Sequence, residues 1–399
     1  MLSSIPLRFT TIIGMSEQPQ SERTIHSPPR LALTLMLVFF VLSGISGLIY
    51  QAVWSQYLGL ILGHAAYAQS LVLSTFMGGM ALGAWVASRY IGRLGSLLRA
   101  YGILEAGIGL FGLAFHAIFL FASGWLFDNW LPRLDGQGAT DLSRYAVALM
   151  LILPQTILLG MTFPVMSAGL IRWQPLSAGR VLGGLYFFNS IGAAAGALLA
   201  TFVLIPQAGL PGAMTFAGAL NLVVAALVLL LRVPPRAAQD VRRSEESASS
   251  PAQSLALLRF VLFAAFVTGA ASFMYEIGWV RMLSLALGSS LHTFELMLAA
   301  FIGGLAFGGL YIRKRLDSIT APLRYFGWVQ VLMGLAALAT LPLYDHAFDA
   351  VGWVVGSLAR SEGGYTLYNW ATAAVSIAIM VPAAFFAGMT LPLMTYALL

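Results

Sequence analysis

The sequence predicts an all-α polytopic membrane protein with about ten transmembrane helices, and three observations support this fold class. Hydrophobic residues make up 59% of the 399-residue chain and charged residues only 9%, whereas soluble domains carry about 25% charged residues. The apolar residues gather in long runs that do not alternate with polar ones. Part of the chain also recurs in tandem, so we expect two related membrane units.

Ten apolar runs are long enough to cross a bilayer as helices, which takes about 20 residues. They are rich in Ala, Leu and Gly and lack the alternating pattern of a transmembrane β-barrel. The predicted spans are 31–53, 65–88, 100–125, 145–170, 180–205, 211–232, 257–280, 290–312, 323–344 and 368–396. Two longer connections, 126–144 and 345–366, are predicted as loops on the outer side.

The positions of Lys and Arg predict the orientation in the membrane. With the N-terminus inside, 17 of the 21 basic residues fall on the cytoplasmic side, as the positive-inside rule requires. We therefore expect a multi-pass protein of the inner (plasma) membrane with a cytoplasmic N-terminus. Residues 1–30 are predicted as a disordered cytoplasmic tail, and the Pro- and Ser-rich residues 233–256 as a cytoplasmic linker.

One apolar sequence occurs twice. Residues 46–63 are SGLIYQAVWSQYLGLILG and residues 271–288 are ASFMYEIGWVRMLSLALG, with an offset of 225. Further Gly, Pro and Phe residues match in the same order, which indicates an internal duplication. The first repeat, 31–232, has six predicted helices, so the second, 257–399, starts on the same side. Such parallel repeats resemble the two halves of major facilitator transporters. The second repeat holds only four predicted helices, so we expect a piece of a longer protein.

Small residues four positions apart predict close helix packing in several spans. The pairs are Gly79 with Gly83, Gly304 with Gly308, and Gly192 with Gly196. Prolines in GMTFP (160–164) and GMTLP (388–392) also lie inside spans, where each removes a backbone donor. These features fit a static, shaped bundle or a moving one, and the sequence leaves both open.

The sequence gives no support for a catalytic or cofactor site. One GxGxxG string, GIGLFG at 107–112, lies inside an apolar span and follows no strand, so it is not expected to bind a dinucleotide. The chain has no cysteine, which excludes disulfides, thiolate catalysis and Cys-based metal sites. It lacks a phosphate-binding loop and a nucleophile elbow. The basic residues lie in short loops between spans, which argues against nucleic acid as a partner. We predict no catalytic residue, metal or cofactor within these residues, and the sequence leaves open whether the protein is an enzyme.

Charged side chains inside the predicted spans are the candidate binding residues. A charge at the bilayer centre costs roughly 2.5–3.5 kcal/mol on insertion scales, so such residues usually face a bundle interior or a wet cavity. Glu276, Arg281 and Glu295 lie towards the outer ends of two spans and are predicted to form a polar pocket. The matching residues of the first repeat are neutral: Gln51, Gln56 and Ser70.

Structural roles for the same charges remain open at this point. Glu276 and Arg281 are five residues apart and are also expected as a structural ion pair. Glu105, inside the third span, has Arg99 six residues earlier as its expected partner. A ligand-binding role for Glu105 is the alternative.

Aromatic residues recur at the predicted outer helix ends. Tyr50 and Trp54 match Tyr275 and Trp279. Their main interpretation is a belt at the membrane interface, and the alternative is an aromatic cage for an amine cation. Asn189, in the fifth span, is expected to hydrogen-bond a neighbouring helix.

Several sequence segments together resemble the membrane region of the spermidine synthase-like membrane proteins, the fused major facilitator/spermidine synthase family. They are SGLIYQAVW, FMGGMALGAW, YGILEAGIGL, LPQTILLGMTFPVM and GRVLGGLYFFNSIGAAAGALLATFVLIPQAGL. The resemblance covers nearly all of 31–399. In that family a cytosolic Rossmann-like domain, similar to aminopropyltransferases, follows the membrane region. Its Gly-Gly-Asp/Glu cofactor signature is not in this chain, so we expect truncation before any catalytic domain and carry over no catalytic residue.

Two functional hypotheses follow from the residues and the resemblance. The first is a transporter-like module in the lipid bilayer that binds or moves a small cationic solute such as a polyamine. The second is a non-transporting anchor for a downstream cytosolic aminopropyltransferase-like domain. The candidate ligand-binding residues are Glu276, Arg281, Glu295, Glu105, Tyr275, Trp279, Tyr50, Gln51 and Asn189.

Overall fold

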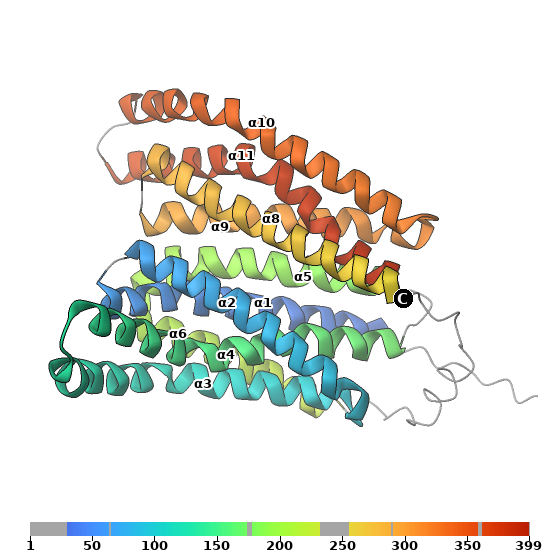
Figure 1. Cartoon of the computed structure of the whole chain (residues 1–399), viewed down its shortest axis with the longest axis horizontal. Coiled ribbons are helices and arrows are strands. Elements are labelled where there is room, and N and C mark those ends of the chain that lie inside the picture. The colour runs from blue at the N-terminus through green and yellow to red at the C-terminus, as the bar shows by residue number, and fades with distance from the viewer. Residues whose placement is uncertain are drawn as a thin grey trace, which may run out of the picture.

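A computed structural model describes residues 30–63, 65–173, 178–231, 255–288, 290–357 and 361–398. Helix accounts for almost all of them, and no strand occurs among these residues. The predicted tail 1–30, apart from Arg30, and most of the predicted linker 233–256 lie outside this part of the chain. Figure 1 shows the long helices lying side by side along one common direction.

The long helices follow the predicted spans. In the first half of the chain they are α1 (Arg30–Leu62), α2 (Ala65–Tyr90), α3 (Leu97–Trp125), α4 (Gln137–Trp173), α5 (Ala178–Leu199) and α6 (Ile205–Leu230). In the second half they are α8 (Leu255–Leu287), α9 (Leu291–Arg313), α10 (Pro322–Ser357) and α11 (Glu362–Ala397). Short helical turns connect some of them: η1 (Ile91–Arg93), η2 (Leu126–Trp130), η3 (Leu131–Arg133), η5 (Ala200–Leu204) and η6 (Leu316–Ser318).

Nine helical stretches of the described chain are long and apolar enough to cross a membrane, and the protein is therefore a multi-pass membrane protein. One of them, Val181–Leu230, is 50 residues long and contains both α5 and α6. Its backbone leaves the helical conformation at Gly209 (φ 66°, ψ −177°), just before Pro211. The parts on either side both pack against α1, which a straight helix of about 75 Å could not do. This stretch therefore holds two of the ten predicted spans.

The two outer connections differ from the prediction because they are largely helical. Residues 126–133 form η2 and η3, and α4 begins at Gln137 inside the predicted loop. In the second connection, 345–366, α10 continues to Ser357 and α11 starts at Glu362. The polar residues that mark these segments as loops in the sequence are exposed on the extended helix ends, for example Asp345 and Asp349.

Matching helix pairs in the two halves cross at matching glycines. Gly83 of α2 lies directly against the carbonyl of Ile157 in α4, and Gly308 of α9 lies directly against the carbonyl of Phe385 in α11. A Cβ atom at either glycine would collide with backbone, so the close approach requires glycine. The offset is 225 between the glycines and 228 between their partners, as in the aligned sequences.

The helices that carry the repeated sequence also end in the same way. Helix α1 ends at Leu62 and is followed by Gly63 (φ 72°), and α8 ends at Leu287 and is followed by Gly288 (φ 79°). Glycine adopts this left-handed conformation without steric cost, which makes it the common residue just after a helix. The repeated sequence thus includes the glycine that ends its helix.

Helix α5 lies between the two halves. On one side its Gly192 and Gly196 fit directly against the backbone of Val41 and Ile45 in α1. On the other side it packs along α9, where Gly309 faces the ring of Tyr186. The two helices that carry the repeated sequence differ in burial: in the most apolar stretch of α1, 72% of the residues are buried, against 11% in α8.

Candidate functional site

A buried chain of hydrogen bonds joins three helices of the first half around Glu105. The Tyr50 hydroxyl donates to Asn221 Oδ1 (2.8 Å), and Asn221 Nδ2 donates to Glu105 Oε2 (2.5 Å). All three side chains are fully buried. The expected pairing of Glu105 with Arg99 is wrong, because Asn221, 116 residues away in sequence, holds the carboxyl group.

Further polar groups from neighbouring helices surround this chain. Gln155 of α4 donates through Nε2 to the carbonyl of Ile108 (3.0 Å). The hydroxyl groups of Tyr101 and Ser43 lie beside the Glu105 carboxyl group. Glu105 Oε1 and the Tyr101 hydroxyl are enclosed but do not reach hydrogen-bonding geometry with any partner. The cluster is enclosed on all sides by helices, and its hydrogen bonds tie α1, α3 and α6 together.

Three of the four recurring aromatic residues are buried and Tyr275 is partly buried, so the buried three do not form the predicted interfacial belt. Tyr50 and Trp54 are fully buried and stack with ring centroids 5.7 Å apart. Tyr275 and Trp279 stack in the same way at 5.5 Å, and Trp279 is 5% exposed. Phe76 and Phe115 pack against Trp54, so these rings form packed core.

The two tryptophans differ in the hydrogen bonding of the indole N–H group. Trp279 Nε1 donates to Thr340 Oγ1 (3.1 Å), whereas Trp54 Nε1 is buried and has no partner in the part of the chain that the structure describes. The residue that corresponds to Thr340 in the first half is Phe115, 225 positions earlier. The second copy has therefore gained a buried hydrogen bond that the first lacks.

The remaining first-half candidates are placed as packing residues. Gln51 is 3% exposed. Asn189 is half-buried, and its backbone carbonyl lies directly against Gly44 of α1. No side-chain hydrogen bond from Asn189 to another helix occurs within the residues the structure describes.

The predicted pocket of Glu276, Arg281 and Glu295 does not form as one unit. Glu276 is 3% exposed and Glu295 1% exposed, whereas Arg281 is exposed. Among the described residues the one ion pair within 4.0 Å joins Arg144 and Asp141, so neither acid is paired with Arg281. Five residues along a helix correspond to a rotation of about 140°, which turns Glu276 and Arg281 to different sides.

Glu295 is the most isolated acid of the second half. It lies in the first turns of α9, and both of its carboxyl oxygens are buried without a hydrogen-bond partner. A buried polar group without a partner costs free energy, and a charged one costs far more. Glu295 is therefore the acid of the second half whose burial is least compensated within the described residues.

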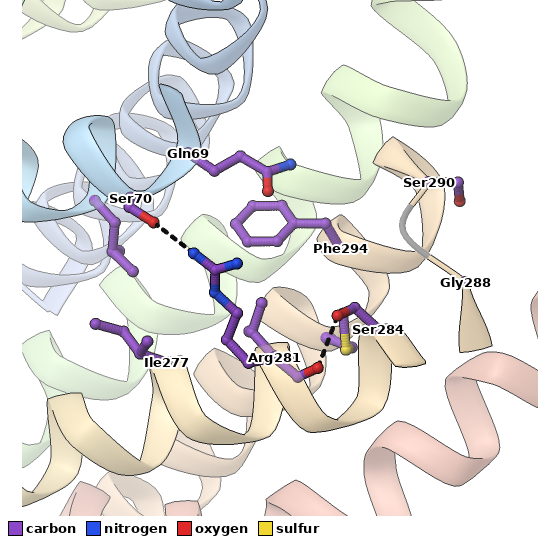
Figure 2. A pocket seen from close by; sticks show the side chains of 11 residues that line it. Gln69, Ser70, Ile277, Arg281, Ser284, Gly288, Ser290 and Phe294 are labelled. Carbon is purple, nitrogen blue, oxygen red and sulfur yellow. Dashed lines mark hydrogen bonds between the residues drawn. The ribbon is translucent and has the colours of Figure 1, made fainter. Parts of the chain in front are cut away.

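Arg281 instead lines a cavity between the two halves, with a volume of about 110 Å³. Its Nη2 donates a long hydrogen bond to Ser70 Oγ in α2 (3.5 Å). Figure 2 shows the guanidinium group pointing towards Ser70, with the amide of Gln69 and the ring of Phe294 beside it. The other lining residues are Leu73, Ile277, Val280, Ser284, Gly288, Ser290 and Met297.

Sequence reasoning missed several members of these sites. Asn221, Gln155 and Tyr101 were not singled out, although a polar side chain within an apolar span is itself a signal of an interior position. Gln69 carried no such signal, because it lies near the start of a span, where polar residues are common.

Comparison with known proteins gives one informative similarity. The chain is 26% identical over 217 residues to a Streptomyces coelicolor protein named polyamine aminopropyltransferase 2. The match covers 53% of this chain and 36% of the relative, so the chain spans about a third of that protein's length. This similarity supports a relationship to the spermidine synthase-like proteins. No family model matches the chain. No solved structure matches it.

Proposed function

We propose that the chain is the integral-membrane module of a spermidine synthase-like protein, and that this module binds a small cationic solute of the polyamine class. The observation that carries the proposal is the pair of buried acids in the second half. Glu276 and Glu295 are almost fully buried and have no basic side chain within ion-pair distance among the described residues. An amine cation would provide the charge that they lack.

A duplicated, transporter-like architecture is part of this proposal. The matching glycine crossings of α2 with α4 and of α9 with α11 support two parallel repeats. The excess of basic residues on one side supports an inner-membrane location with a cytoplasmic N-terminus. The name of the Streptomyces relative supports a polyamine as the solute.

Binding and uptake of labelled spermidine in proteoliposomes test this function. We expect binding by the wild-type chain, and loss of roughly tenfold or more in affinity for Glu295→Gln, since a charge-assisted contact contributes about 1.5–3 kcal/mol. Asp349→Asn, an exposed acid on α10, is the matched control and should bind as the wild type does. Equal binding by all three proteins would contradict the proposal.

The second candidate is a membrane anchor for an aminopropyltransferase. It is favoured by the matched relative, whose name is that of a transferase and of which this chain covers 36%. It is also favoured by the first half, where Asn221 already donates a hydrogen bond to the buried Glu105 carboxyl group, so that this acid is not left for a solute. Cells that express the full-length gene with and without the segment 30–398 distinguish the two. An anchor predicts that the transferase moves from the membrane to the soluble fraction and keeps its activity, with no spermidine binding by the membrane segment.

A further inference from the structure

The cavity that Arg281 lines has an electrostatic character opposite to that of the buried acids. Arg281 is the sole charged residue of its lining. Neither Glu276 nor Glu295 lines it, and no acid of the described chain lies within 4.0 Å of the guanidinium nitrogens. A cationic solute would be repelled here, whereas an anion would be attracted.

The donors around the cavity suit an oxyanion. The Arg281 guanidinium presents a planar fork of N–H donors, of which one makes a long contact with Ser70. Gln69 brings a side-chain amide to the same wall. Ser290 caps the start of α9 and also lines the cavity, so the positive end of that helix dipole borders it.

The volume of the cavity and the apolar part of its lining restrict the class of ligand further. A volume of about 110 Å³ equals roughly four water molecules in the liquid, which is enough for a phosphate group. Leu73, Ile277 and Val280 form an apolar wall beside the polar one. This combination fits a phosphate group that is either free or attached to the apolar tail of a lipid.

Three of the five polar lining residues lie in the second half of the chain. Arg281 corresponds to Gln56, Ser284 to Gly59 and Ser290 to Ala65, all 225 positions earlier. The first copy thus lacks the cation and both hydroxyl groups. Ser284 Oγ donates to the backbone carbonyl of Arg281 (2.8 Å) and Ser290 Oγ caps α9, so both hydroxyl groups also have structural partners. The change from Gln56 to Arg281 is the one that helix capping does not account for.

We propose that the cavity between α2, α8 and the start of α9 is a binding site for a phosphate group, with Arg281 as its principal ligand. This proposal does not rest on the cationic solute proposed above, because neither Glu276 nor Glu295 lines the cavity. The phosphate comes either from a small soluble anion or from the head group of an anionic lipid.

The test uses the purified chain in a neutral detergent. Inorganic phosphate is titrated by calorimetry, and nanodiscs of phosphatidylglycerol or phosphatidylcholine are compared by thermal melting. Arg281→Gln replaces the arginine by the residue type found at the matching position of the first copy, Gln56, and Arg281→Lys keeps the charge. Arg259→Gln, an exposed arginine near the opposite end of α8, is the matched control.

We expect Arg281→Gln to weaken phosphate binding roughly tenfold or more, Arg281→Lys to retain part of it, and Arg259→Gln to leave it unchanged. Stabilisation by phosphatidylglycerol alone, lost in Arg281→Gln, would support the same site with a lipid as the source. If neither probe depends on Arg281, in variants that melt as the wild type does without anion, the proposal is wrong.

Discussion

The two halves of the chain share their backbone contacts but differ in the polar groups that they enclose. Gly83 and Gly308 make equivalent crossings, and Gly63 and Gly288 end equivalent helices. In the first half the buried acid Glu105 is held by Asn221 from α6. In the second half Glu295 is buried with no partner for its carboxyl oxygens. Glycine contacts thus constrain the shape of a membrane bundle, while the polar interior is free to change.

Cysteine labelling gives the largest expected effect, because its outcome is all or none. The chain has no natural cysteine, so Gly95→Cys and Thr320→Cys each introduce one thiol, and both positions are exposed. They correspond through the offset of 225, and parallel repeats predict that both react with an impermeant maleimide only after the cells are permeabilised. Labelling of just one of the two in intact cells would show that the halves are inverted.

Substitution at the crossing glycines gives the next largest effect. Gly83→Leu and Gly308→Leu place a side chain against the backbone of the adjacent helix, and we expect each to lower the free energy of unfolding by about 3 kcal/mol or more. Gly78→Ala and Gly303→Ala are controls, since no atom lies within 4 Å of a Cβ built there. Thermal melting in detergent measures both pairs. A variant Gly83→Leu that melts like Gly78→Ala would contradict the close crossing.

The hydrogen-bonded chain of the first half gives a smaller effect. Asn221→Leu leaves Glu105 and Tyr50 buried without their shared partner, and we expect a loss of about 1–3 kcal/mol in unfolding free energy. Thr215→Val, an exposed position on the same helix, is the control. An unchanged melting temperature in Asn221→Leu would show that the chain of hydrogen bonds contributes nothing to stability.

The two tryptophans give the smallest effect and the finest comparison. Trp279→Phe removes the hydrogen bond to Thr340, whereas Trp54→Phe removes none. A double-mutant cycle of Trp279→Phe with Thr340→Val should give a coupling of about 0.6 kcal/mol, the average for hydrogen bonds between helices in a membrane. The matching cycle of Trp54→Phe with Phe115→Leu lacks this hydrogen bond, so only packing contributes to its coupling.

Local sequence properties predicted the membrane helices and several of their close crossings. The apolar runs identified the helices, and glycines four positions apart identified the crossings, because both signals lie within one segment. The outer connections were mispredicted, since polar residues such as Asp345 and Asp349 also occur on a helix that extends past the bilayer.

The candidate sites were predicted less well because they depend on residues far apart in the chain. The acids were found as interior residues, but the partner of Glu105 comes from another helix. Helix rotation separates Glu276 from Arg281, which the spacing alone did not reveal. The contact of Arg281 with Ser70 joins residues 211 positions apart in the chain, which the sequence alone did not reveal.

The placement of α5 has a consequence for any motion of the protein. Its contact with α1 is glycine against backbone, and its contact with α9 brings Gly183 against the backbone of Arg313 and Gly309 against the ring of Tyr186. A helix held closely on both sides cannot slide without losing van der Waals contacts. A movement of one half against the other would therefore have to break close contacts of α5 on at least one of its two sides.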